Sequence, residues 1–441
     1  MSDTIFALAS GQGRAGVGVV RVSGPDAGTL LDGLVRVRPK PRQAGLRRLQ
    51  CQGGPVLDEA LVLWFPGPGS FTGEDSVEFH LHGGPAIFEA VFAALSALGG
   101  RPAEPGEFSR RAFANGKMDL TEAEGLADLI DAETEAQRAQ ALAQMSGSLR
   151  TLYDGWRERL ISVLAALEGE IDFPDEDDVP DALSGVAAEP LRTLIAALEE
   201  HLDDSGRGER VRDGFSIALI GAPNAGKSSL LNALAGREAA IVTDIPGTTR
   251  DIVEVRLVLN GFAVIVADTA GVRETADQIE AEGVKRALAR AEDADLRLAL
   301  VDVSRETSSA TVLDRLEHDD AIVYTKSDLN RAVESVSGDH HSFYISVRTG
   351  EGLNALEAWL REVVSQRLGG REAPALSRAR HRDGVQRALM HLARAHHGLE
   401  GPPELVSADV HLALRSIEGL TGRIDVEDVL DRVFSQFCIG K

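Results

Sequence analysis

The fold of the central part of this chain is decided by the stretch Gly221-Ala222-Pro223-Asn224-Ala225-Gly226-Lys227-Ser228. It follows the apolar run Phe215–Ile220 and precedes a segment of helical periodicity that starts near Ser229. A glycine-rich loop between a strand and a helix is the context of a P-loop, whose backbone N–H groups surround phosphate. Lys227 is then expected to reach the β- and γ-phosphates of a nucleotide, and Ser228 to bind Mg²⁺.

Three further motifs follow this loop in the order typical of GTP-hydrolysing domains. Gly247-Thr248-Thr249-Arg250-Asp251 supplies a switch threonine. Asp268-Thr269-Ala270-Gly271 ends a strand, so that Asp268 can hold the Mg²⁺ shell and the Gly271 N–H can sense the γ-phosphate. Thr325-Lys326-Ser327-Asp328 ends another strand and places Asp328 to accept from two guanine donors. Each motif alone is a weak signal, but together in this order they predict a GTPase domain.

Two positions depart from the translation-factor-related GTPases that these motifs resemble. Thr325 stands where that pattern has Asn, and Ser346-Val347-Arg348 stands where it has Ser-Ala-Lys. We expect Thr325 to loosen base binding. The second departure matters less because the contact there is a backbone N–H. Asp328 is retained, so guanine remains favoured over adenine.

The rest of the chain divides by pattern into segments of different fold class. Residues 1–117 show short apolar strands broken by Gly and Pro, with one amphipathic helix, and predict an α+β domain. Residues 118–213 and 369–441 are helical, whereas 214–368 alternate strand and helix. Neither helical half forms a complete bundle. We therefore expect a multidomain protein in which an all-α helical domain is interrupted by an inserted α/β P-loop GTPase domain.

Local signals place the elements more closely. Asn260-Gly261 predicts a hairpin turn, and hence a mainly parallel sheet with one antiparallel edge pair. Thr121 with Glu124 fits a capping box, and the helical pattern runs on from there to Ile171. The expected strands are Thr4–Ala9, Gly18–Val22, Glu59–Phe65, Val77–Leu81, Phe215–Ile220, Ile252–Leu259, Phe262–Ala267, Leu296–Val301, Ala321–Tyr324 and Phe343–Ser346; the expected helices outside the GTPase segment include Pro85–Leu98 and Glu189–Leu202.

Charge and composition limit the function classes. The formal net charge of −23 argues against broad, sequence-blind binding of nucleic acid, but it does not exclude a local basic patch. No apolar run approaches the ~20 residues that cross a bilayer, and the start lacks the pattern of a signal peptide. The two cysteines, Cys51 and Cys438, imply no disulfide framework. These features predict a cytoplasmic protein.

Beyond the GTPase motifs, the chain resembles one family from residue 5 to 441, the bacterial and organellar tRNA modification GTPases MnmE, also called TrmE. The resemblance rests on these motifs and on short stretches along the whole chain. They are Gly16-Val17-Gly18-Val19-Val20-Arg21-Val22-Ser23-Gly24, Ser70-Phe71-Thr72-Gly73-Glu74-Asp75, His82-Gly83-Gly84-Pro85, Pro105-Gly106-Glu107-Phe108-Ser109 and the terminal Cys438-Ile439-Gly440-Lys441.

The resemblance implies that the N-terminal domain dimerises the protein and binds 5-formyl- or 5,10-methylene-tetrahydrofolate. The folate contacts it implies are Arg21, Glu78, Lys117 and Lys441. The residue types suit the ligand, because a pterin presents an amino-pyrimidine edge to a carboxylate and the folate tail is anionic. Without the resemblance, Glu78 on an alternating strand reads as a solvated residue.

The resemblance also assigns metals and catalytic roles. It implies K⁺ ligands at Asn224, Thr243, Ile245 and Thr248, and Mg²⁺ ligands at Ser228 and Thr249. The bound K⁺ would take the place of an arginine finger. Glu280 matches the glutamate that orients the attacking water; without the resemblance it is one acid on a charged helix. Lys227 and Cys438 complete the expected catalytic set, Cys438 with a role in the modification chemistry.

Motifs and resemblance together give the full set of expected contacts to GTP or GDP. They are Asn224, Ala225, Gly226, Lys227, Ser228, Ser229, Thr243, Thr248, Thr249, Asp268, Gly271, Thr325, Lys326, Asp328, Ser346 and Val347.

The resemblance implies a homodimer that works with the FAD-dependent protein MnmG (GidA). Together they would add an aminomethyl or carboxymethylaminomethyl group to carbon 5 of the wobble uridine of certain tRNAs. GTP hydrolysis would act as a conformational motor. Two alternatives stay open: a ribosome-assembly GTPase of the Era or Der type, and a folate-dependent aminomethyltransferase with a regulatory nucleotide domain. The acidic composition speaks against the first, which usually carries a basic RNA-binding module.

Overall fold

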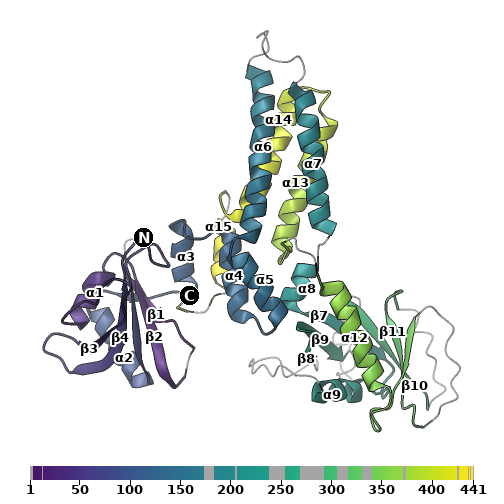
Figure 1. Ribbon diagram of the computed structural model, residues 1–441, viewed down its shortest axis with the longest axis horizontal. Coiled ribbons are helices and arrows are strands. Elements are labelled where there is room, and N and C mark those ends of the chain that lie inside the picture. Colours follow the sequence, from purple (N-terminus) through teal and green to yellow (C-terminus); the bar gives the residue numbers. More distant parts are fainter. Residues whose placement is uncertain are drawn as a thin grey trace, which may run out of the picture. The chain divides into compact units, whose positions relative to one another are not determined.

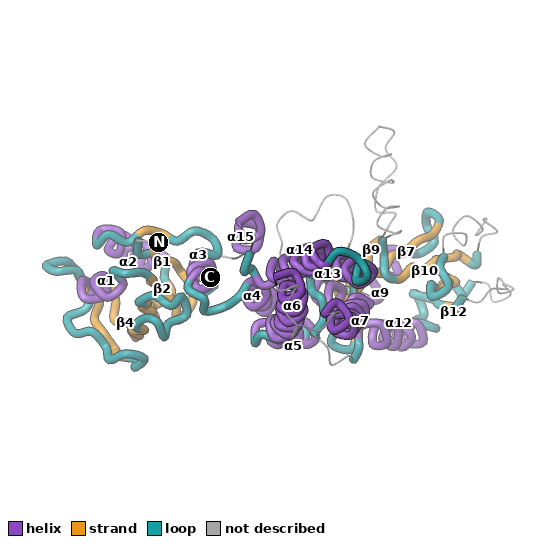
Figure 2. Tube along the Cα trace, turned by 90° about the horizontal axis from the view of Figure 1, so that it is seen from above, coloured by secondary structure: helices purple, strands orange, loops and turns teal. Residues whose placement is uncertain are grey.

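The computed structural model describes residues 3–11, 13–172, 183–203, 206–237, 254–268, 293–304, 316–329, 340–370, 374–424, 427–435, 437, 439 and 440. The chain forms two compact units, whose elements are labelled in Figure 1 and seen from above in Figure 2. One comprises Met1–Ala127, Gln144–Leu191 and Met390–Lys441, and the other Asp128–Ala143 and Arg192–Leu389. These units do not coincide with the four segments expected from the sequence, whose limits stay a prediction.

The first unit contains an N-terminal six-stranded sheet of order β3-β4-β5-β2-β1-β6. Its strands are β1 (Ile5–Leu8), β2 (Ala15–Ser23), β3 (Gly45–Gln50), β4 (Val56–Phe65), β5 (Ser76–Gly83) and β6 (Arg101–Pro102). All neighbours pair antiparallel except β1 and β6. The predicted α+β domain is confirmed, and β3 and β6 are strands that the sequence patterns did not reveal.

Alternation along the strands gives this sheet two different faces. On one face Val20, Val22, Val77 and Phe79 are buried with residues of α1 (Ala27–Leu34) and α2 (Pro85–Ala97). The residues between them point to the opposite face, where the helix α3 (Glu107–Ala114) packs through Phe108 against Ile5 and Ala7. Arg21 of β2 and Glu78 of β5 are direct register partners on that second face.

The helical region departs from the sequence-based expectation in two details. The single segment expected up to Ile171 is three helices, separated by short breaks, the second of which contains Gly147 with a φ of +86°. The capping box is formed by Asp119 and Glu122, whose side chains accept from each other's backbone N–H, and not by Thr121 and Glu124. The described helices of the two helical segments are α4 (Leu120–Asp131), α5 (Glu135–Met145), α6 (Ser148–Asp172), α7 (Leu183–Asp203), α8 (Arg207–Asp213), α13 (Ala379–His397), α14 (Pro403–Thr421) and α15 (Glu427–Phe434).

Within the first unit, α6 and α14 lie side by side along their lengths (Figure 1). Leu160 of α6 and Val410 of α14 are fully buried, and an ion pair of 2.7 Å joins Arg157 to Glu418. Segments far apart in the sequence therefore form one helical layer, as expected for a domain with an insertion. In the part of the chain that the structure describes, no helix has the length and apolarity that crossing a bilayer requires.

The second unit contains the predicted α/β domain, with a sheet of order β12-β11-β10-β7-β9-β8. Only β8 and β9 pair antiparallel, at the sheet edge, and they are joined by Asn260 (φ +49°) and Gly261 (φ +83°). The hairpin and the single antiparallel edge pair are both confirmed. The elements are β7 (Phe215–Gly221), α9 (Lys227–Arg237), β8 (Glu254–Leu259), β9 (Phe262–Asp268), β10 (Leu296–Asp302), β11 (Ala321–Thr325), β12 (His341–Tyr344) and α12 (Leu353–Leu368).

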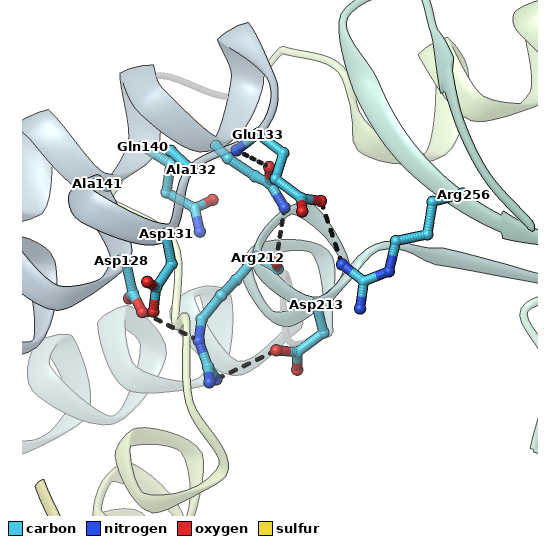
Figure 3. Close-up of a pocket in the computed structure, with 10 residues that line it drawn as sticks. Asp128, Asp131, Ala132, Glu133, Gln140, Ala141, Arg212, Asp213 and Arg256 are labelled. Atoms are coloured by element: carbon cyan, nitrogen blue, oxygen red, sulfur yellow. Dashed lines mark hydrogen bonds and ion pairs between the residues drawn. The ribbon is translucent and has the colours of Figure 1, made fainter. Parts of the chain in front are cut away.

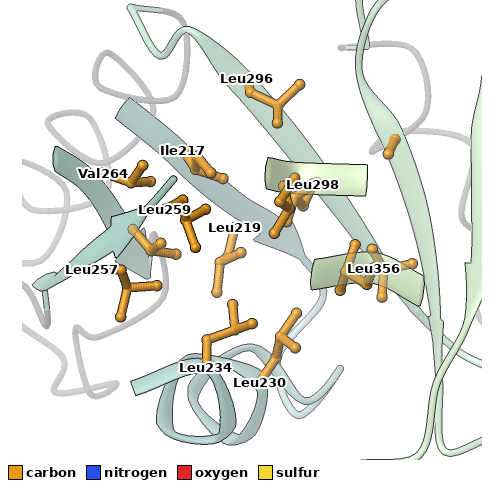
Figure 4. Close-up of a cluster of buried hydrophobic side chains, with 14 of the residues drawn as sticks. Ile217, Leu219, Leu230, Leu234, Leu257, Leu259, Val264, Leu296, Leu298 and Leu356 are labelled. Carbon is orange, nitrogen blue, oxygen red and sulfur yellow. The ribbon is translucent and has the colours of Figure 1, made fainter. Parts of the chain in front are cut away.

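The core of this domain positions the P-loop. Leu230 and Leu234 of α9 pack beneath the central strands, where Leu219 and Leu298 are fully buried (Figure 4). Leu356 of α12 joins the same cluster. Because α9 is held against the sheet by these leucines, the loop between β7 and α9 is fixed at both ends.

Candidate nucleotide and folate sites

The loop between β7 and α9 has the backbone geometry of a phosphate-binding loop. Asn224 has a φ of +64° and Gly226 a φ of +96°. Asparagine tolerates the left-handed region better than most residues, so Asn224 has a backbone reason to occupy its place whether or not it binds K⁺. A side chain at Gly226 would be strained at this φ and would lie 3.6 Å from Thr325.

Lys227 is buried against the loop that it would serve. Its ammonium donates to the carbonyl oxygens of Gly221 (2.7 Å) and Ala222 (3.0 Å). Burial lowers the pKa of Lys227, and the nearby charge of Asp268 opposes that shift. The cation is thus held at the loop by weak neutral acceptors, which phosphate oxygens would replace with stronger, charged ones.

Ser228 and Asp268 meet beside the loop, as a Mg²⁺ site requires. The Ser228 hydroxyl donates to Asp268 Oδ2 at 2.6 Å, and Asp268, the last residue of β9, is buried. A hydroxyl and a carboxylate are hard oxygen donors of the kind that Mg²⁺ prefers. The pair therefore fits the cation expected from the sequence.

The base motif is tied to the P-loop through Thr325. Its buried hydroxyl donates to the carbonyl oxygen of Ala225 at 2.7 Å. The Lys326 ammonium bonds to Asp302 Oδ2 at 2.5 Å and approaches the Asn224 carbonyl oxygen at 3.3 Å. Burial would raise the pKa of Asp302, but hydrogen bonds from Lys326 and Ser304 outweigh it and the pKa is lowered. These bonds hold the loop and the base motif together.

Asp328 is already engaged by two donors. The Ser346 hydroxyl donates to Asp328 Oδ1 and the Arg348 guanidinium to Oδ2, each at 2.8 Å. The hydrogen bond from Ser346 is the main cause of the lowered pKa of Asp328, and Arg348 adds to it. Of the other expected contacts, Val347 packs against the core and Ser229 is exposed. These donors hold Asp328 as an ionised acceptor after β11.

Eight of the expected site residues lie outside the described residues. They are Thr243, Ile245, Thr248, Thr249, Gly271, Glu280, Cys438 and Lys441. Their predicted roles stay predictions.

On the second face of the N-terminal sheet, Arg21 and Glu78 bind each other. The guanidinium of Arg21 meets Glu78 Oε1 at 3.0 Å, and both side chains are about one-fifth exposed, at 22%. The Arg21 guanidinium also lies 5.4 Å from the ring of Phe71 and 5.8 Å from that of Phe108. Glu78 is therefore not the solvated residue that alternation alone suggested, because it belongs to a half-buried charged cluster flanked by aromatic rings.

Lys117 lies against the loop that carries Phe71. Its ammonium donates to the carbonyl oxygen of Pro68 at 2.9 Å, and neighbouring Asn115 donates to that of Thr72 at 2.7 Å. The structure thus connects Lys117 to the cluster of Arg21 and Glu78 through the segment 68–72. Three of the four expected folate contacts share one region of the sheet.

An ionic network around the buried Arg111, which the sequence patterns did not reveal, fixes this region. Arg111, 1% exposed, bonds to Asp3, Glu74 and Glu107, and Arg101 bonds to Asp3 and Glu107. The network attaches α3 to the chain start and to the loop after β4. Glu74 and Glu107 lie in stretches that carried the family resemblance, but their spacing gave no sign that they would meet.

The last described residues lie against the N-terminal domain. Ile439 forms an antiparallel bridge with Pro105, and an added Cβ at Gly440 (φ +98°) would lie 2.1 Å from the Leu8 carbonyl oxygen. Leu8 pairs with Val20, the neighbour of Arg21. The described end of the chain therefore lies against β1, which pairs with the strand that carries Arg21.

Other residues of the two sites were also missed. Asp302 had no motif to mark it, and its only signal was its place at the end of β10, next to β11 in the sheet. Phe71 and Phe108 were within resembling stretches but had no assigned role. Arg348 was noted only as a departure from the usual Lys.

Comparison with known proteins assigns the family. A family model described as "MnmE helical domain" matches residues 120–438, and one described as "GTP-binding protein TrmE N-terminus" matches residues 4–117. Curated relatives named tRNA modification GTPase MnmE are 61% identical in Maricaulis maris and 54% in Caulobacter vibrioides, and each match covers 100% of both chains.

Among solved structures, the G domain of the T. maritima FeoB iron transporter is 26% identical, over 35% of this chain and 98% of that one. Its TM-score of 0.28 is too low to add to the assignment. The family models and the full-length relatives suffice, and they disfavour the Era or Der alternative. This chain belongs to the MnmE (TrmE) family of tRNA modification GTPases.

Proposed function

We propose that the chain is a K⁺-dependent GTPase that acts as a cytoplasmic homodimer with an FAD-dependent partner of the MnmG (GidA) type. Together they add an aminomethyl or carboxymethylaminomethyl group to carbon 5 of the wobble uridine (U34) of certain tRNAs. The observation that carries this proposal is the presence in one chain of two equipped sites. One is the P-loop with Lys227, and the other is the half-buried pair of Arg21 and Glu78.

In the nucleotide site the side chains act by position and charge. Lys227 would transfer its donors from the loop carbonyls to the β- and γ-phosphate oxygens, and Ser228 and Asp268 would hold Mg²⁺, which would neutralise phosphate charge. Asp328 accepts from the guanine edge in place of Arg348. Asn224 would contribute to a K⁺ site, where the ion supplies positive charge against the phosphates. Glu280 would orient the attacking water.

In the folate site Glu78 accepts from the amino-pyrimidine edge of the pterin. Arg21 pairs with that carboxylate, and the Phe71 and Phe108 rings supply apolar flanks for a flat ligand. Lys117 and Lys441 would meet the anionic tail. Tetrahydrofolate supplies the one-carbon unit, and Cys438 would act near it. We propose this assignment because the residues present suit each part of the ligand.

The hairpin β8–β9 is the proposed mechanical link between GTP hydrolysis and the helical region. It joins the segment that contains Thr248 and Thr249 to Asp268, so one nucleotide-binding motif precedes β8 in the chain and another begins at the end of β9; we call these two motifs the switches. At its other end, Gly261 accepts from the backbone N–H of Ala136 in α5 at 3.1 Å. A movement of the switches that shifts the hairpin would therefore also displace α5.

An ion pair strengthens this link. Arg256 of β8 meets Glu133 at 3.1 Å on the rim of a polar pocket of about 490 Å³, which Arg212 and Asp128 also line (Figure 3). A Glu133→Ala variant should keep its GTP turnover and modify tRNA less well. The matched control is Glu135→Ala, at a position two residues after Glu133. It removes an exposed ion pair to Arg138, and both its GTP turnover and its tRNA modification should equal those of the parent.

Nucleoside analysis of tRNA tests the function itself. Digested tRNA from cells that lack this protein should contain unmodified uridine at the wobble position, and the modification should return when the gene is restored. Wobble uridines that stay fully modified in the deletion strain would refute the proposal.

The K⁺ requirement has a separate test. GTP hydrolysis measured at equal ionic strength should be much faster in KCl than in NaCl, and equal rates would remove K⁺ from the mechanism. A Glu280→Ala variant should bind GTP as the parent does and hydrolyse it poorly. Near-normal turnover in that variant would reject its role.

A further inference from the structure

The segment between α1 and β4 concentrates positive charge in an otherwise acidic chain. No Asp or Glu occurs from residue 33 to residue 57, whereas the whole chain has a net charge of −23. The cations of this segment are Arg36, Arg38, Lys40, Arg42, Arg47 and Arg48. All are exposed except Arg47, which is half-buried. We call this set the basic segment.

Part of the basic segment lines a groove at the edge of the N-terminal sheet. Arg36, Arg47 and Arg48 line a hollow of about 880 Å³, together with Gln50, Gln52, the carboxylate of Asp32 and apolar residues that include Val37 and Leu46. The strand β3 is the terminal strand of its sheet, and it pairs with β4 on one side. The groove is therefore open to a ligand along the free side of the sheet.

Few of these cations are neutralised. Arg38 is the exception, because it forms a bidentate pair with Asp32 and lies over the Trp64 ring. Within the described parts of the chain, Arg47 donates to the backbone carbonyl oxygens of Val37 and Leu46, and Arg48 is 3.9 Å from an exposed Glu59. No carboxylate among the described residues pairs with Arg36 or Lys40. Asp32, the carboxylate among the described residues that line the groove, is paired with Arg38, so Arg36, Arg47 and Arg48 leave the groove with a net positive charge.

Protection of a sheet edge does not account for this pattern. Charged residues on an edge strand do prevent pairing with other chains. However, Arg36 and Lys40 precede β3 and do not lie on it, yet Arg36 lines the same groove. The side chains of Val37 and Leu46 are about two-thirds exposed beside them, at 66% and 65%. An edge designed only to repel other chains would not present exposed apolar side chains.

We infer that this basic groove binds the sugar-phosphate backbone of tRNA. This inference rests on the proposed function, which makes tRNA the substrate. RNA offers a regular row of phosphates to arginine and lysine, and such contacts give affinity without reading sequence. No aromatic ring lines the groove among the described residues, so base stacking is not its mode of contact. The groove would hold the body of the tRNA while the wobble base is modified elsewhere.

The test removes charge from the groove and leaves both proposed sites intact. The first variant carries Arg36→Glu, Lys40→Glu and Arg48→Glu, and a milder one carries Gln at the same three positions. The matched control carries Arg138→Glu, Arg159→Glu and Arg387→Glu, three exposed arginines with the same total change of charge. Arg42 is left unchanged because it bonds to Gly69 in the loop that carries Phe71.

Fluorescence anisotropy with an end-labelled, unmodified tRNA transcript measures the affinity of the full-length proteins over a range of KCl concentrations. The groove variant should bind at least about tenfold more weakly than the parent. The slope of log K against log salt should also be smaller by about 0.7–0.9 for each phosphate that the variant no longer binds. The control should stay within about twofold of the parent, and all variants should hydrolyse GTP at the parental rate. If the triple Glu variant unfolds at a lower temperature than the parent, the triple Gln variant tests the inference instead. It should also bind tRNA more weakly than the parent, by a smaller factor.

Three results would overturn the inference. The first is an unchanged tRNA affinity in the groove variant. The second is an equal decrease of affinity in the control, which would assign the effect to net charge. The third is binding to anionic lipid vesicles that depends on the groove while tRNA binding does not. None of these touches the proposed function, which fails only if wobble uridines stay modified without the protein.

Discussion

The nucleotide site and the charged cluster of Arg21 and Glu78, which we propose binds folate and call the folate cluster, are assembled in different ways. In the nucleotide site, Asn224, Lys227 and Ser228 are neighbours in sequence, and the backbone between β7 and α9 sets their geometry. In the folate cluster, Arg21 and Glu78 come from strands 57 residues apart, and only the register of β2 with β5 brings them together. A contiguous site is visible in the sequence, whereas one built by strand register is not.

The two sites also differ in the partners that their charged side chains have when no ligand is bound. Lys227 is bonded to neutral carbonyl oxygens of its own loop, so a phosphate can replace them at small cost. Arg21 and Glu78 neutralise each other, so a ligand must share or separate an ion pair. We therefore expect nucleotide binding to tolerate fewer changes of charge than folate binding, and substitutions can test this difference.

The largest effect is expected from Lys227→Ala. Removal of this ammonium takes away the main positive charge at the β- and γ-phosphates, and it should lower kcat for GTP hydrolysis by about 10²–10³-fold. Steady-state phosphate release measures it. Folate binding should be unchanged, because the sites share no residue. A loss of both activities would mean that the two sites are not independent.

A smaller effect is expected from Glu78→Gln. The amide keeps the size of the side chain but removes the charge, so a charge-assisted hydrogen bond worth about 1.5–3 kcal/mol is lost. Binding of 5-formyltetrahydrofolate, measured by calorimetry, should weaken by about 10–100-fold while GTP turnover is kept. Equal affinity in Glu78→Gln and the parent would exclude Glu78 as the pterin acceptor. Glu59→Gln, an exposed residue of β4, is the control.

The ionic network beside the folate cluster predicts a dependence of stability on pH. Hydrogen bonds from Arg101 lower the pKa of Asp3, and in Glu107 they outweigh burial, so that its pKa is also lowered from 4.5. The ionised carboxylates of Asp3 and Glu107 stabilise the folded protein fully at a pH above their ordinary pKa values. This stabilisation is lost as the pH falls through their lowered pKa values in the folded protein. Glu107→Gln should therefore cost about 1–3 kcal/mol of unfolding free energy at pH 7 and progressively less below about pH 4. Denaturant unfolding at several pH values measures this, and a constant difference down to pH 3 would contradict it.

The smallest effect is expected from Thr325→Asn. Threonine keeps the bond to the Ala225 carbonyl oxygen, but its side chain is too short to add a second contact to the base. Asparagine should tighten GDP binding by about fivefold, because one added hydrogen bond to the base stabilises the complex by about 1 kcal/mol. Thr325→Val, which removes the hydroxyl alone, should weaken binding by a similar factor. The affinity for GDP should be highest with Asn at position 325, lower with Thr and lowest with Val. Any other order would refute this account of Thr325.

The sequence predicted the fold well where local signals are strong. The strand before Gly221, the Asn260-Gly261 hairpin and the parallel sheet all follow from periodicity and turn chemistry. The signals failed at Thr121, because Asp119 offered a better cap two residues earlier, and at Gly147, where one glycine ends a long helical pattern. Short edge strands such as β3 were missed because Gly45–Gln50 has no alternation of polar and apolar residues.

Site contacts between residues far apart in the sequence could not be predicted from the sequence. The link of Thr325 to Ala225 and that of Lys326 to Asp302 join residues of different strands and loops, and no spacing rule encodes them. The ion pair of Arg21 and Glu78 needed the register of the sheet. Only the resemblance to relatives selected these two residues in advance, and no property of the residues themselves would have done so.

The central claim is that both sites serve one reaction on tRNA. Cells lacking the protein would be supplied with the parent, with Lys227→Ala or with Glu78→Gln at equal protein levels, and the wobble nucleosides of their tRNA would be measured by mass spectrometry. We predict full modification with the parent and strongly reduced modification with either variant, although each variant damages only one site. Full modification with either variant would contradict the claim.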